Sequence, residues 1–480
     1  MSEQLDKIDE LFEKMEKSIP EPKDESVREK NTSNNLIAEF VSQVSALMDT
    51  PDIFITGIGY WLTSSLLGEY LTTMTTQRPL KPNIYLVLSS KPGTTRRSTL
   101  LSIADDIMIR VYGEDIYGKR YHSGGSKEGL IDGIMDSGQN YVHIFMPEFG
   151  VVLDEFRKKD WMSGIAGLIS KLYYGETWKE EYSKRFRSYD RYIRDVYATL
   201  IGDMQETGVY IDPKFVKQGL MRRLIFLTAK KEDFKLDNYK PLVSLEAYEN
   251  RKTRNVIVEE LTQKFKERRK YLQENLTEDV LIIVQDSVER QINEIDFENW
   301  KKAIEKYESE DPESYLAPEA EKLLKLTLLE ALADLENKVV DLGGTKVFNI
   351  LPRHLERALK FYEIAKARTF EVFSEALNPV KPVEFIPSTY RIRQRIKNII
   401  DSSPGRIIML GMLEKKSNLA AKDLKPYLLE LYKENEIGIG KVRTFRKPAI
   451  YIYSCSDDDF LKIYESAEIV LGKEVEEMLK

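Results

Sequence analysis

Residues 83–101 read NIYLVLSSKPGTTRRSTLL and join a strand pattern to a helix pattern. The first part is an apolar run with the composition of a buried strand, and the last part has the pattern of a helix start. A short loop containing proline, glycine and threonine joins the two. This layout is typical of a phosphate-binding loop, in which backbone N–H groups and a helix N-terminus face the phosphates.

The sequence of this loop departs from the standard motif G-x-x-x-x-G-K-[ST]. When the motif is laid on the chain, Lys91 and Arg96 stand at its two glycines. Arg97 replaces the lysine, and Ser98 takes the position whose hydroxyl holds Mg²⁺. The alternative interpretation is that the arginines only begin a helix, although two cations there oppose its dipole. The predicted phosphate-binding residues are Lys91, Gly93, Thr94, Thr95, Arg96, Arg97, Ser98 and Thr99.

Composition limits the class of protein. The chain has 480 residues and a formal charge of −7, so it is long enough for two or three domains and is not basic as a whole. A single cysteine excludes an internal disulfide, and three histidines argue against a histidine-rich metal site. No apolar run approaches the roughly 18–20 residues of a membrane span. We therefore expect a cytoplasmic protein with no membrane partner, and the abundance of Lys and Glu suits a thermophile.

Apolar runs and helical patterns alternate between about residues 80 and 230. This alternation predicts an α/β core with a mostly parallel sheet and helices on both faces. Residues 154–195 and, further on, 245–378 have the pattern of helices. The predicted segments are an acidic N-terminal arm that is either mobile or docks a partner (1–34), the α/β core (35–245), a helical domain (246–378), a proline-rich linker (379–387), a winged-helix domain (388–455) and an acidic C-terminal helix (456–480).

Polar residues follow two of the predicted strands. Glu148 comes shortly after the apolar run at 141–145, where a carboxylate in a nucleotide-hydrolysing site polarises the attacking water. Asp203 and Gln205 close the next run and are candidates to sense a terminal phosphate or to position water. The plain alternative is that these residues are surface polar groups at strand ends.

Two arginines precede the last strand of the predicted core. Arg222 and Arg223 stand at a junction between a predicted helix and the strand 224–229. An arginine at such a junction is a candidate finger toward the γ-phosphate, either within the same subunit or across a subunit boundary. The alternative is that both face solvent or form salt bridges.

The order of these motifs resembles that of the RecA/AAA+-like P-loop ATPases of phages, plasmids and integrated elements that accompany primases as helicase-like replication proteins. In that group the loop often reads PPG-x-x-[RK]KST, and a strand ending in Asp-Glu-Phe/Leu-Gly follows. The segments that carry the resemblance are KPGTTRRST (91–99), Glu148-Phe-Gly, LISKLYYG (168–175), GLMRRL (219–224) and LPRHLERALKFYEIAKA (351–367).

The resemblance implies a P-loop NTPase core followed by a helical bundle, with ATP and Mg²⁺ as cofactors. It also implies a homo-oligomeric ring, such as a hexamer, that acts in DNA replication or translocation. The chain departs from the family at Arg97, where lysine is usual, and at Pro147, where the magnesium-shell aspartate is usual. These departures favour nucleotide binding over fast hydrolysis. A non-hydrolysing DNA-binding scaffold or regulator is therefore the second hypothesis, and a structural protein without nucleotide is the third.

The predicted winged-helix domain is the basic part of this acidic chain. Residues 391–447 contain fourteen Lys/Arg against six Asp/Glu, an excess of eight. Three helical patterns followed by two short strands with a basic turn favour groove and phosphate contacts with duplex DNA. A winged helix that binds protein is the alternative. The predicted DNA-binding residues are Lys415, Lys416, Lys422, Lys425, Lys441, Arg443, Arg446 and Lys447.

Overall fold

The chain divides into two compact units, Met1–Val380 and Lys381–Lys480, and each is described by itself. The division falls within the predicted linker (379–387), whose residues lie outside the described part of the chain. The computed structural model describes residues 34–76, 78–91, 93, 95–113, 120–122, 141–146, 148–158, 160–176, 178–180, 191–193, 195–205, 220–234, 245–307, 318–377, 388–417, 421–442, 449–454, 456–463, 467–471 and 474–475.

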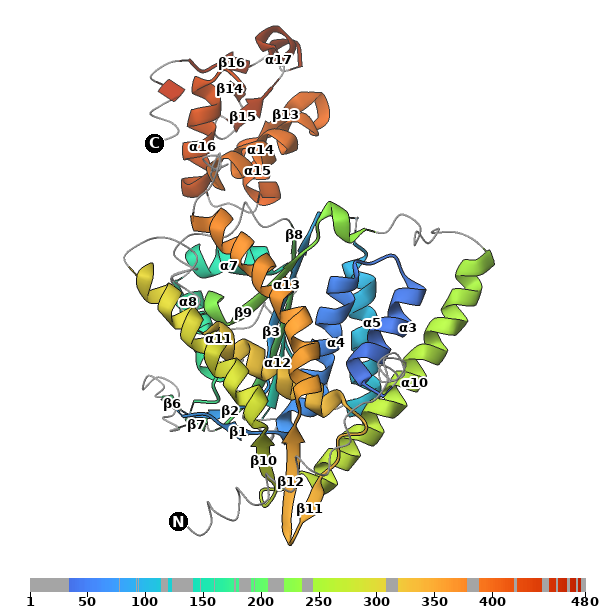
Figure 1. Cartoon of the computed structure of the whole chain (residues 1–480). Coiled ribbons are helices and arrows are strands. Elements are labelled where there is room, and N and C mark those ends of the chain that lie inside the picture. Colours follow the sequence, from blue (N-terminus) through green and yellow to red (C-terminus); the bar gives the residue numbers. More distant parts are fainter. Residues whose placement is uncertain are drawn as a thin grey trace. The chain divides into compact units, whose positions relative to one another are not determined.

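A five-stranded parallel sheet forms the centre of the larger unit (Figure 1). Its order is β4-β5-β8-β3-β9, which places the strand before the phosphate-type loop second from one edge. The predicted parallel sheet is therefore confirmed. The strands are β3 (Tyr85–Ser90), β4 (Arg120–His122), β5 (Tyr141–Met146), β8 (Tyr197–Gln205) and β9 (Leu224–Thr228).

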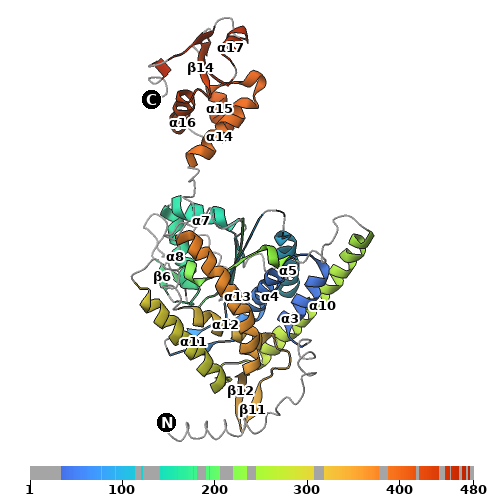
Figure 2. The same ribbon diagram turned by 45° about the horizontal axis from the view of Figure 1, so that its top comes forward.

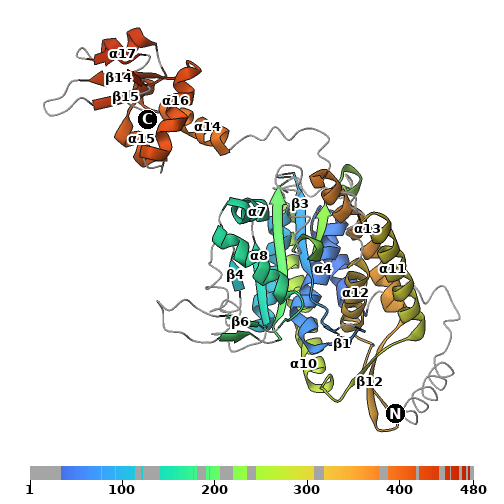
Figure 3. The ribbon, with the colours of Figure 1, turned by 90° about the vertical axis from the view of Figure 1, so that its left-hand side faces the viewer.

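Helices cover both faces of this sheet, as predicted (Figures 2 and 3). Because side chains alternate along a strand, Leu86 and Leu88 of β3 enter one hydrophobic cluster while Tyr85 and Val87 enter the other. Gly202 of β8 lets Phe149 approach closely, since an added Cβ would lie 3.1 Å from the Phe149 Cβ. One face is covered by α3 (Leu36–Leu47), α4 (Asp52–Leu67), α5 (Arg97–Tyr112) and α10 (Leu245–Asn275), and the other by α7 (Phe149–Lys158) and α8 (Asp160–Leu172).

The outer edge of β9 is closed by side chains of two later helices, α12 (Glu319–Ala333) and α13 (Pro352–Leu377). Thr369 Oγ1 accepts from the Phe226 amide at 3.0 Å, and Lys322 Nζ donates to the Leu224 carbonyl at 3.1 Å. Both side chains are buried. These bonds satisfy backbone groups that an open edge strand would expose to other chains.

The predicted helical domain is therefore not a separate unit. Residues of α10, α12 and α13 share one hydrophobic cluster with α3, α4 and α5. Short strands also interrupt the helical pattern, including those in a sheet of order β10-β12-β11. The remaining elements of this region are β10 (Leu281–Val284), α11 (Asp286–Glu305), β11 (Val340–Leu342) and β12 (Thr345–Ile350).

Residues 154–195 are helical only in their first half, as far as the structure describes them. Two short antiparallel strands follow α8, so the prediction of continuous helix is wrong there. The minor elements of the larger unit are η1 (Gly68–Tyr70), β1 (Thr73–Met74), β2 (Pro79–Leu80), β6 (Trp178–Glu180), β7 (Arg191–Ile193), η4 (Met221–Arg223) and η5 (Lys231–Asp233).

The smaller unit packs three helices against a four-stranded antiparallel sheet of order β13-β15-β14-β16. The predicted C-terminal helix is wrong, because a short helix and then the strand β16 follow β15. Phe460, Val470 and Val475 are buried, so this C-terminal part completes the same fold. The elements are α14 (Ser388–Asp401), η8 (Pro404–Arg406), β13 (Ile407–Met409), α15 (Leu410–Ser417), α16 (Ala421–Lys433), β14 (Gly438–Val442), β15 (Ala449–Tyr453), α17 (Asp457–Ile463) and β16 (Ala467–Ile469).

Within the described part of the chain, every helix is too short or too polar to cross a lipid bilayer.

The contact between Gly68 and Tyr197 gives a test of the packing between α4 and the sheet. A Cβ at Gly68 would lie 1.9 Å from the Tyr197 hydroxyl, which is held by the Ser64 and Pro82 carbonyls. We expect Gly68→Ala to lower the free energy of unfolding by about 1–3 kcal/mol through overpacking. Thermal unfolding of the purified chain measures this.

Gly167→Ala is the matched control, because a Cβ at this exposed position of α8 meets no atom within 4 Å. It should leave stability unchanged or raise it by up to about 1 kcal/mol, since alanine favours a helix over glycine. Equal effects of the two substitutions would contradict the packing described for Gly68.

Candidate functional site

The carboxyl ends of β3, β5 and β8 meet at one edge of the sheet. Parallel register places Ser90 beside Gln205 and Met146 beside Gly202. The residues that follow these strands therefore gather at the same edge. Glu148 and Asp203 are brought into direct contact, because the Glu148 amide donates to Asp203 Oδ1 at 3.3 Å. Glu148 and Gln205 are exposed, whereas Asp203 is half-buried.

The phosphate-type loop leaves this edge after Ser90 and leads into α5. Within it, Gly93 has a φ of +77° and Arg96 a φ of +46°, so the backbone turns twice through the left-handed region. Thr95 is buried, and its hydroxyl lies 2.7 Å from that of Ser90. Pro92 and Thr94 lie outside the described residues. The loop therefore has one end tied to the strand by a hydroxyl pair.

The N-terminus of α5 has no side-chain cap. Arg96 occupies the N-cap position, and its side chain makes no capping hydrogen bond. The first N–H groups of a helix have no partner within the helix, and they carry its partial positive charge. Ser98 and Thr99 in this first turn are exposed, as is Lys91 at the start of the loop. The arrangement can receive an anion on backbone N–H groups and hydroxyls.

The two neighbouring arginines point to different partners. Arg97 Nη1 donates to the Leu88 carbonyl at 3.0 Å and also to the Met204 carbonyl. Burial lowers the pKa of the Arg97 guanidinium, and the nearby Asp203 carboxylate partly offsets this. Arg96 Nε instead lies 2.9 Å from Asp49 Oδ1. The loop thus has one cation directed into the sheet and another directed to the segment between α3 and α4.

That segment is the part of the site that the sequence did not indicate. Thr50 Oγ1 donates to the Thr95 carbonyl at 2.9 Å, next to the ion pair of Asp49 with Arg96. This segment and the loop are separated by more than 40 residues in the sequence. No motif marks Asp49 or Thr50, so only the folded chain brings them to the loop.

The described residues contain no cluster of three or more His, Cys, Asp or Glu side chains that would cage a metal ion. Mg²⁺ in phosphate sites is usually held by one or two carboxylates together with the phosphates and water. Asp203 and Glu148, with the exposed hydroxyl of Ser98, supply donors of that kind. This donor set fits Mg²⁺ that arrives with a phosphate ligand.

Arg222 and Arg223 lie at the opposite end of the strands, where β3 and β9 begin. They precede β9, whose first residue Leu224 is in register with Tyr85 at the start of β3. The loop instead follows Ser90, about 16 Å away along the strand at roughly 3.3 Å per residue. The prediction of an arginine finger within the same subunit is therefore wrong, because a residue before a parallel strand and a residue after its neighbour lie at opposite ends of the strands. A finger toward a neighbouring subunit stays a prediction.

At this opposite end Arg223 belongs to a cluster of cations and tyrosines. The Arg223 guanidinium lies 4.6 Å from the centre of the Tyr174 ring, and Arg78 lies 3.4 Å from the same ring. Lys325 Nζ lies 3.4 Å from the Tyr173 ring centre. The cluster places three cations against two aromatic rings, which is a stabilising arrangement.

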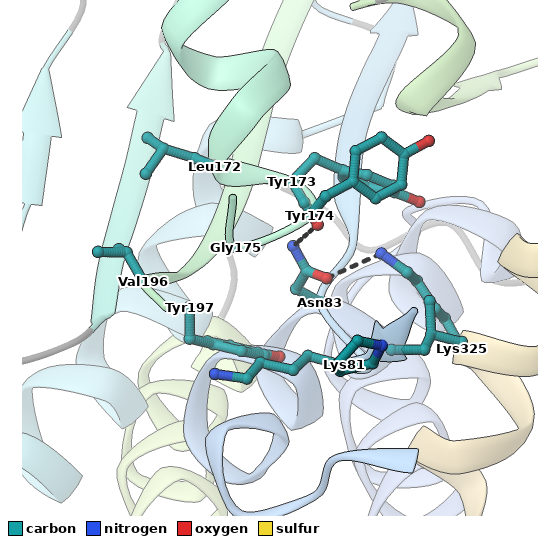
Figure 4. Close-up of a pocket in the computed structure, with 11 residues that line it drawn as sticks. Lys81, Asn83, Leu172, Tyr173, Tyr174, Gly175, Val196, Tyr197 and Lys325 are labelled. Carbon is teal, nitrogen blue, oxygen red and sulfur yellow. Dashed lines mark hydrogen bonds between the residues drawn. The ribbon is translucent and has the colours of Figure 1, made fainter. Parts of the chain in front are cut away.

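A small cavity beside this cluster is lined by residues that hydrogen bonds of Asn83 hold together (Figure 4). Asn83 Nδ2 donates to the Tyr173 and Ala198 carbonyls, and Asn83 Oδ1 accepts from Lys325 Nζ at 2.8 Å. Burial lowers the pKa of Lys325 to about 7, against the opposing effect of Glu321. With a volume of about 10 Å³, the cavity holds at most one water molecule. It therefore offers no room for a substrate.

The basic residues of the smaller unit are in part neutralised. Lys441 on β14 pairs with Glu474, and Lys397 lies 3.3 Å from Glu436. Lys415 and Lys416 are exposed in the last turn of α15, and Lys425 is half-buried on α16. The side chain of Lys422 and all of Arg443, Arg446 and Lys447 lie outside the described residues. Glu436 is already subtracted in the excess of eight, but Glu474 lies beyond residue 447, so the count over 391–447 overstates the positive charge near Lys441.

No protein-family model matches this chain, and no curated protein resembles it significantly in sequence. The family resemblance therefore rests on the motifs alone.

The place assigned to Arg223 is testable by a double-mutant cycle with Tyr174. We expect Arg223→Gln to lower the free energy of unfolding by about 0.5–2 kcal/mol, because the cation–π contact is lost from a partly buried site. Tyr174→Leu should remove the same contact, so the double variant should be less destabilised than the sum of the two. Thermal and urea unfolding give the four values. Strict additivity would contradict the contact.

Proposed function

We propose that this chain is a DNA-dependent ATPase of a mobile genetic element, acting in DNA replication or translocation as a homo-oligomer. The observation that carries the proposal is the edge where the loop, the uncapped start of α5, Glu148 and Asp203 lie together. A phosphate-type loop alone is weak support. A phosphate-type loop that lies beside the carboxylates predicted to act with it is more specific support than the loop alone.

The path of the chain through the sheet supports a ligand at this edge. The chain leaves β3 toward β4, which lies beyond β8 and β5, and leaves β8 toward β9, which lies beyond β3. The connections from these neighbouring strands thus run in opposite directions. Open parallel sheets bind ligands outside the carboxyl ends of the strands at such a switch point.

In this proposal the phosphates of ATP lie on the backbone of the loop and on the first turn of α5. Mg²⁺, when bound, neutralises charge on the phosphate oxygens. Asp203 and Ser98 face its shell, and the exposed Glu148 orients and polarises the attacking water. Gln205, two residues after Asp203 on β8, contacts the terminal phosphate in this proposal. The core is then a P-loop NTPase of the RecA/AAA+ type.

A non-hydrolysing DNA-binding scaffold or regulator is the second candidate, and one observation favours it. Arg97, at the position of the usual lysine, is engaged by two backbone carbonyls of the central strands. Arginine keeps the charge but is bulkier than lysine between phosphates. In this second candidate function, bound ATP acts as a structural switch and is not hydrolysed.

Steady-state ATP hydrolysis with and without duplex DNA separates the two candidates. We expect DNA-stimulated turnover in the wild type and a loss of at least about 100-fold in Glu148→Gln, because the general base is removed. Glu298→Gln, on the exposed face of α11, is the matched control and should turn over like the wild type. Absence of turnover in the wild type, with ATP still bound, would select the scaffold.

The smaller unit supports the DNA part of the proposal. Its order of helix α14, strand β13, helices α15 and α16 and hairpin β14–β15 is compatible with the proposed winged helix. In such domains a helix enters the major groove and the hairpin contacts the backbone. Lys415 and Lys416 present charge on its surface, and phosphate contacts of this kind bind DNA with little sequence preference.

We expect the double substitution Lys415→Glu and Lys416→Glu to weaken duplex DNA binding and to flatten its salt dependence. Each phosphate contact removed lowers the slope of log K against log salt by about 0.9. Fluorescence anisotropy with a labelled duplex over a range of salt concentrations measures both effects. Lys301→Glu with Lys302→Glu, an exposed pair on α11, makes the same charge change in the larger unit. Equal losses in the two double variants would show that these lysines act only through net charge.

A further inference from the structure

The two arginines of the loop make different contacts, and this difference assigns them different roles. The assignment rests on the proposed nucleotide site and deepens it. It concerns Arg96, Arg97 and Asp49, of which the sequence indicated only the first two. The question is which side chain reaches a phosphate bound on the loop.

Arg97 is fixed by the two central strands. Its guanidinium joins the Leu88 carbonyl of β3 to the Met204 carbonyl of β8, and the side chain is half-buried there. Moving it to a ligand would leave the Leu88 and Met204 carbonyls without this donor, and a partly buried carbonyl that loses its hydrogen bond is unfavourable. Arg97 therefore acts as a brace: it links β3, which leads into the loop, to β8, which contains Asp203.

Arg96 is held from outside the sheet. Its left-handed backbone directs the side chain toward Asp49, where the ion pair measures 2.9 Å. A non-glycine residue in this conformation persists where its surroundings impose it. Two contacts at this turn come from the segment between α3 and α4, because Thr50 Oγ1 also donates to the Thr95 carbonyl. The Arg96 side chain remains about one-third exposed, so a ligand can reach it without rearrangement of the core.

We infer that Arg96 is the side chain that contacts the bound phosphates, that the Asp49 carboxylate occupies its guanidinium before nucleotide binds, and that Arg97 is a brace between β3 and β8. A phosphate can take the place of the carboxylate, because the planar guanidinium donates to the oxygen atoms of either anion. Asp49 thereby sets the affinity of the site without taking part in any reaction.

The affinity of the full-length chain for ATP, measured by displacement of a fluorescent ATP analogue, tests these roles. Arg96→Gln should weaken ATP binding about 10- to 100-fold, the loss of one charge-assisted bond. Asp49→Asn should tighten it about 2- to 5-fold, because the competing carboxylate is neutralised at a partly exposed pair. Arg97→Gln should change the affinity less than about threefold.

Thermal unfolding without nucleotide is the second readout, and it separates the brace from the ligand contact. Arg97→Gln should lower the unfolding midpoint by several degrees, whereas Arg96→Gln should leave it nearly unchanged. If Arg97→Gln does not fold, Arg97→Lys replaces it, with the same expectation of lowered stability and retained affinity.

The outcomes distinguish this inference from the proposed function. A wild type that binds no ATP overturns both. A wild type that binds ATP, with Arg97→Gln losing affinity at unchanged stability while Arg96→Gln binds normally, reverses the roles and overturns only the inference. Weaker binding by Asp49→Asn would show that the carboxylate supports the ligand rather than competing with it.

Discussion

Parallel pairing of β3 on both of its edges is the constraint on which the rest of the larger unit depends. All six residues of this strand are buried, so it needs an apolar layer on each face and a strand on each side. Two helical layers and the neighbours β8 and β9 meet that need. Because the strands are parallel, their carboxyl ends then share one edge, and the chain has to leave β3 there.

The closing of β9 explains why the helices after the sheet belong to the same unit. An edge strand with no neighbour leaves backbone groups unsatisfied, and here buried Thr369 and Lys322 bond to them. A lysine taken out of water needs such a partner, and Lys322 also has Glu319 at 2.6 Å. The sheet and the later helices therefore stabilise each other, which a division of the sequence by helical pattern does not reveal.

The site combines a loop of unusual sequence with a familiar position. The loop lacks the lysine that normally reaches phosphate, yet it stands at the switch point of the sheet with two carboxylates beside it. Because Arg97 is engaged by strand carbonyls, the positive charge that a ligand can reach lies on Arg96, on exposed Lys91 and on the N-terminus of α5. Asp49 and Thr50 are then part of the site, although they lie in the segment between α3 and α4.

From the sequence alone the parallel sheet and its helical cover on both faces could be predicted, and Glu148 and Asp203 could be placed at strand ends, but their contact is seen only in the structure. Apolar runs of strand length alternate with helical periodicity, and the residues after parallel strands must share an edge. The tertiary structure alone decided the direction of each arginine and the place of Arg222 and Arg223. It also decided that the strands β10 to β12 and β16 exist, because short strands are stabilised by partners distant in sequence rather than by their own composition. Register, edge closure and long-range ion pairs depend on which segments meet in space, and local patterns carry no record of that.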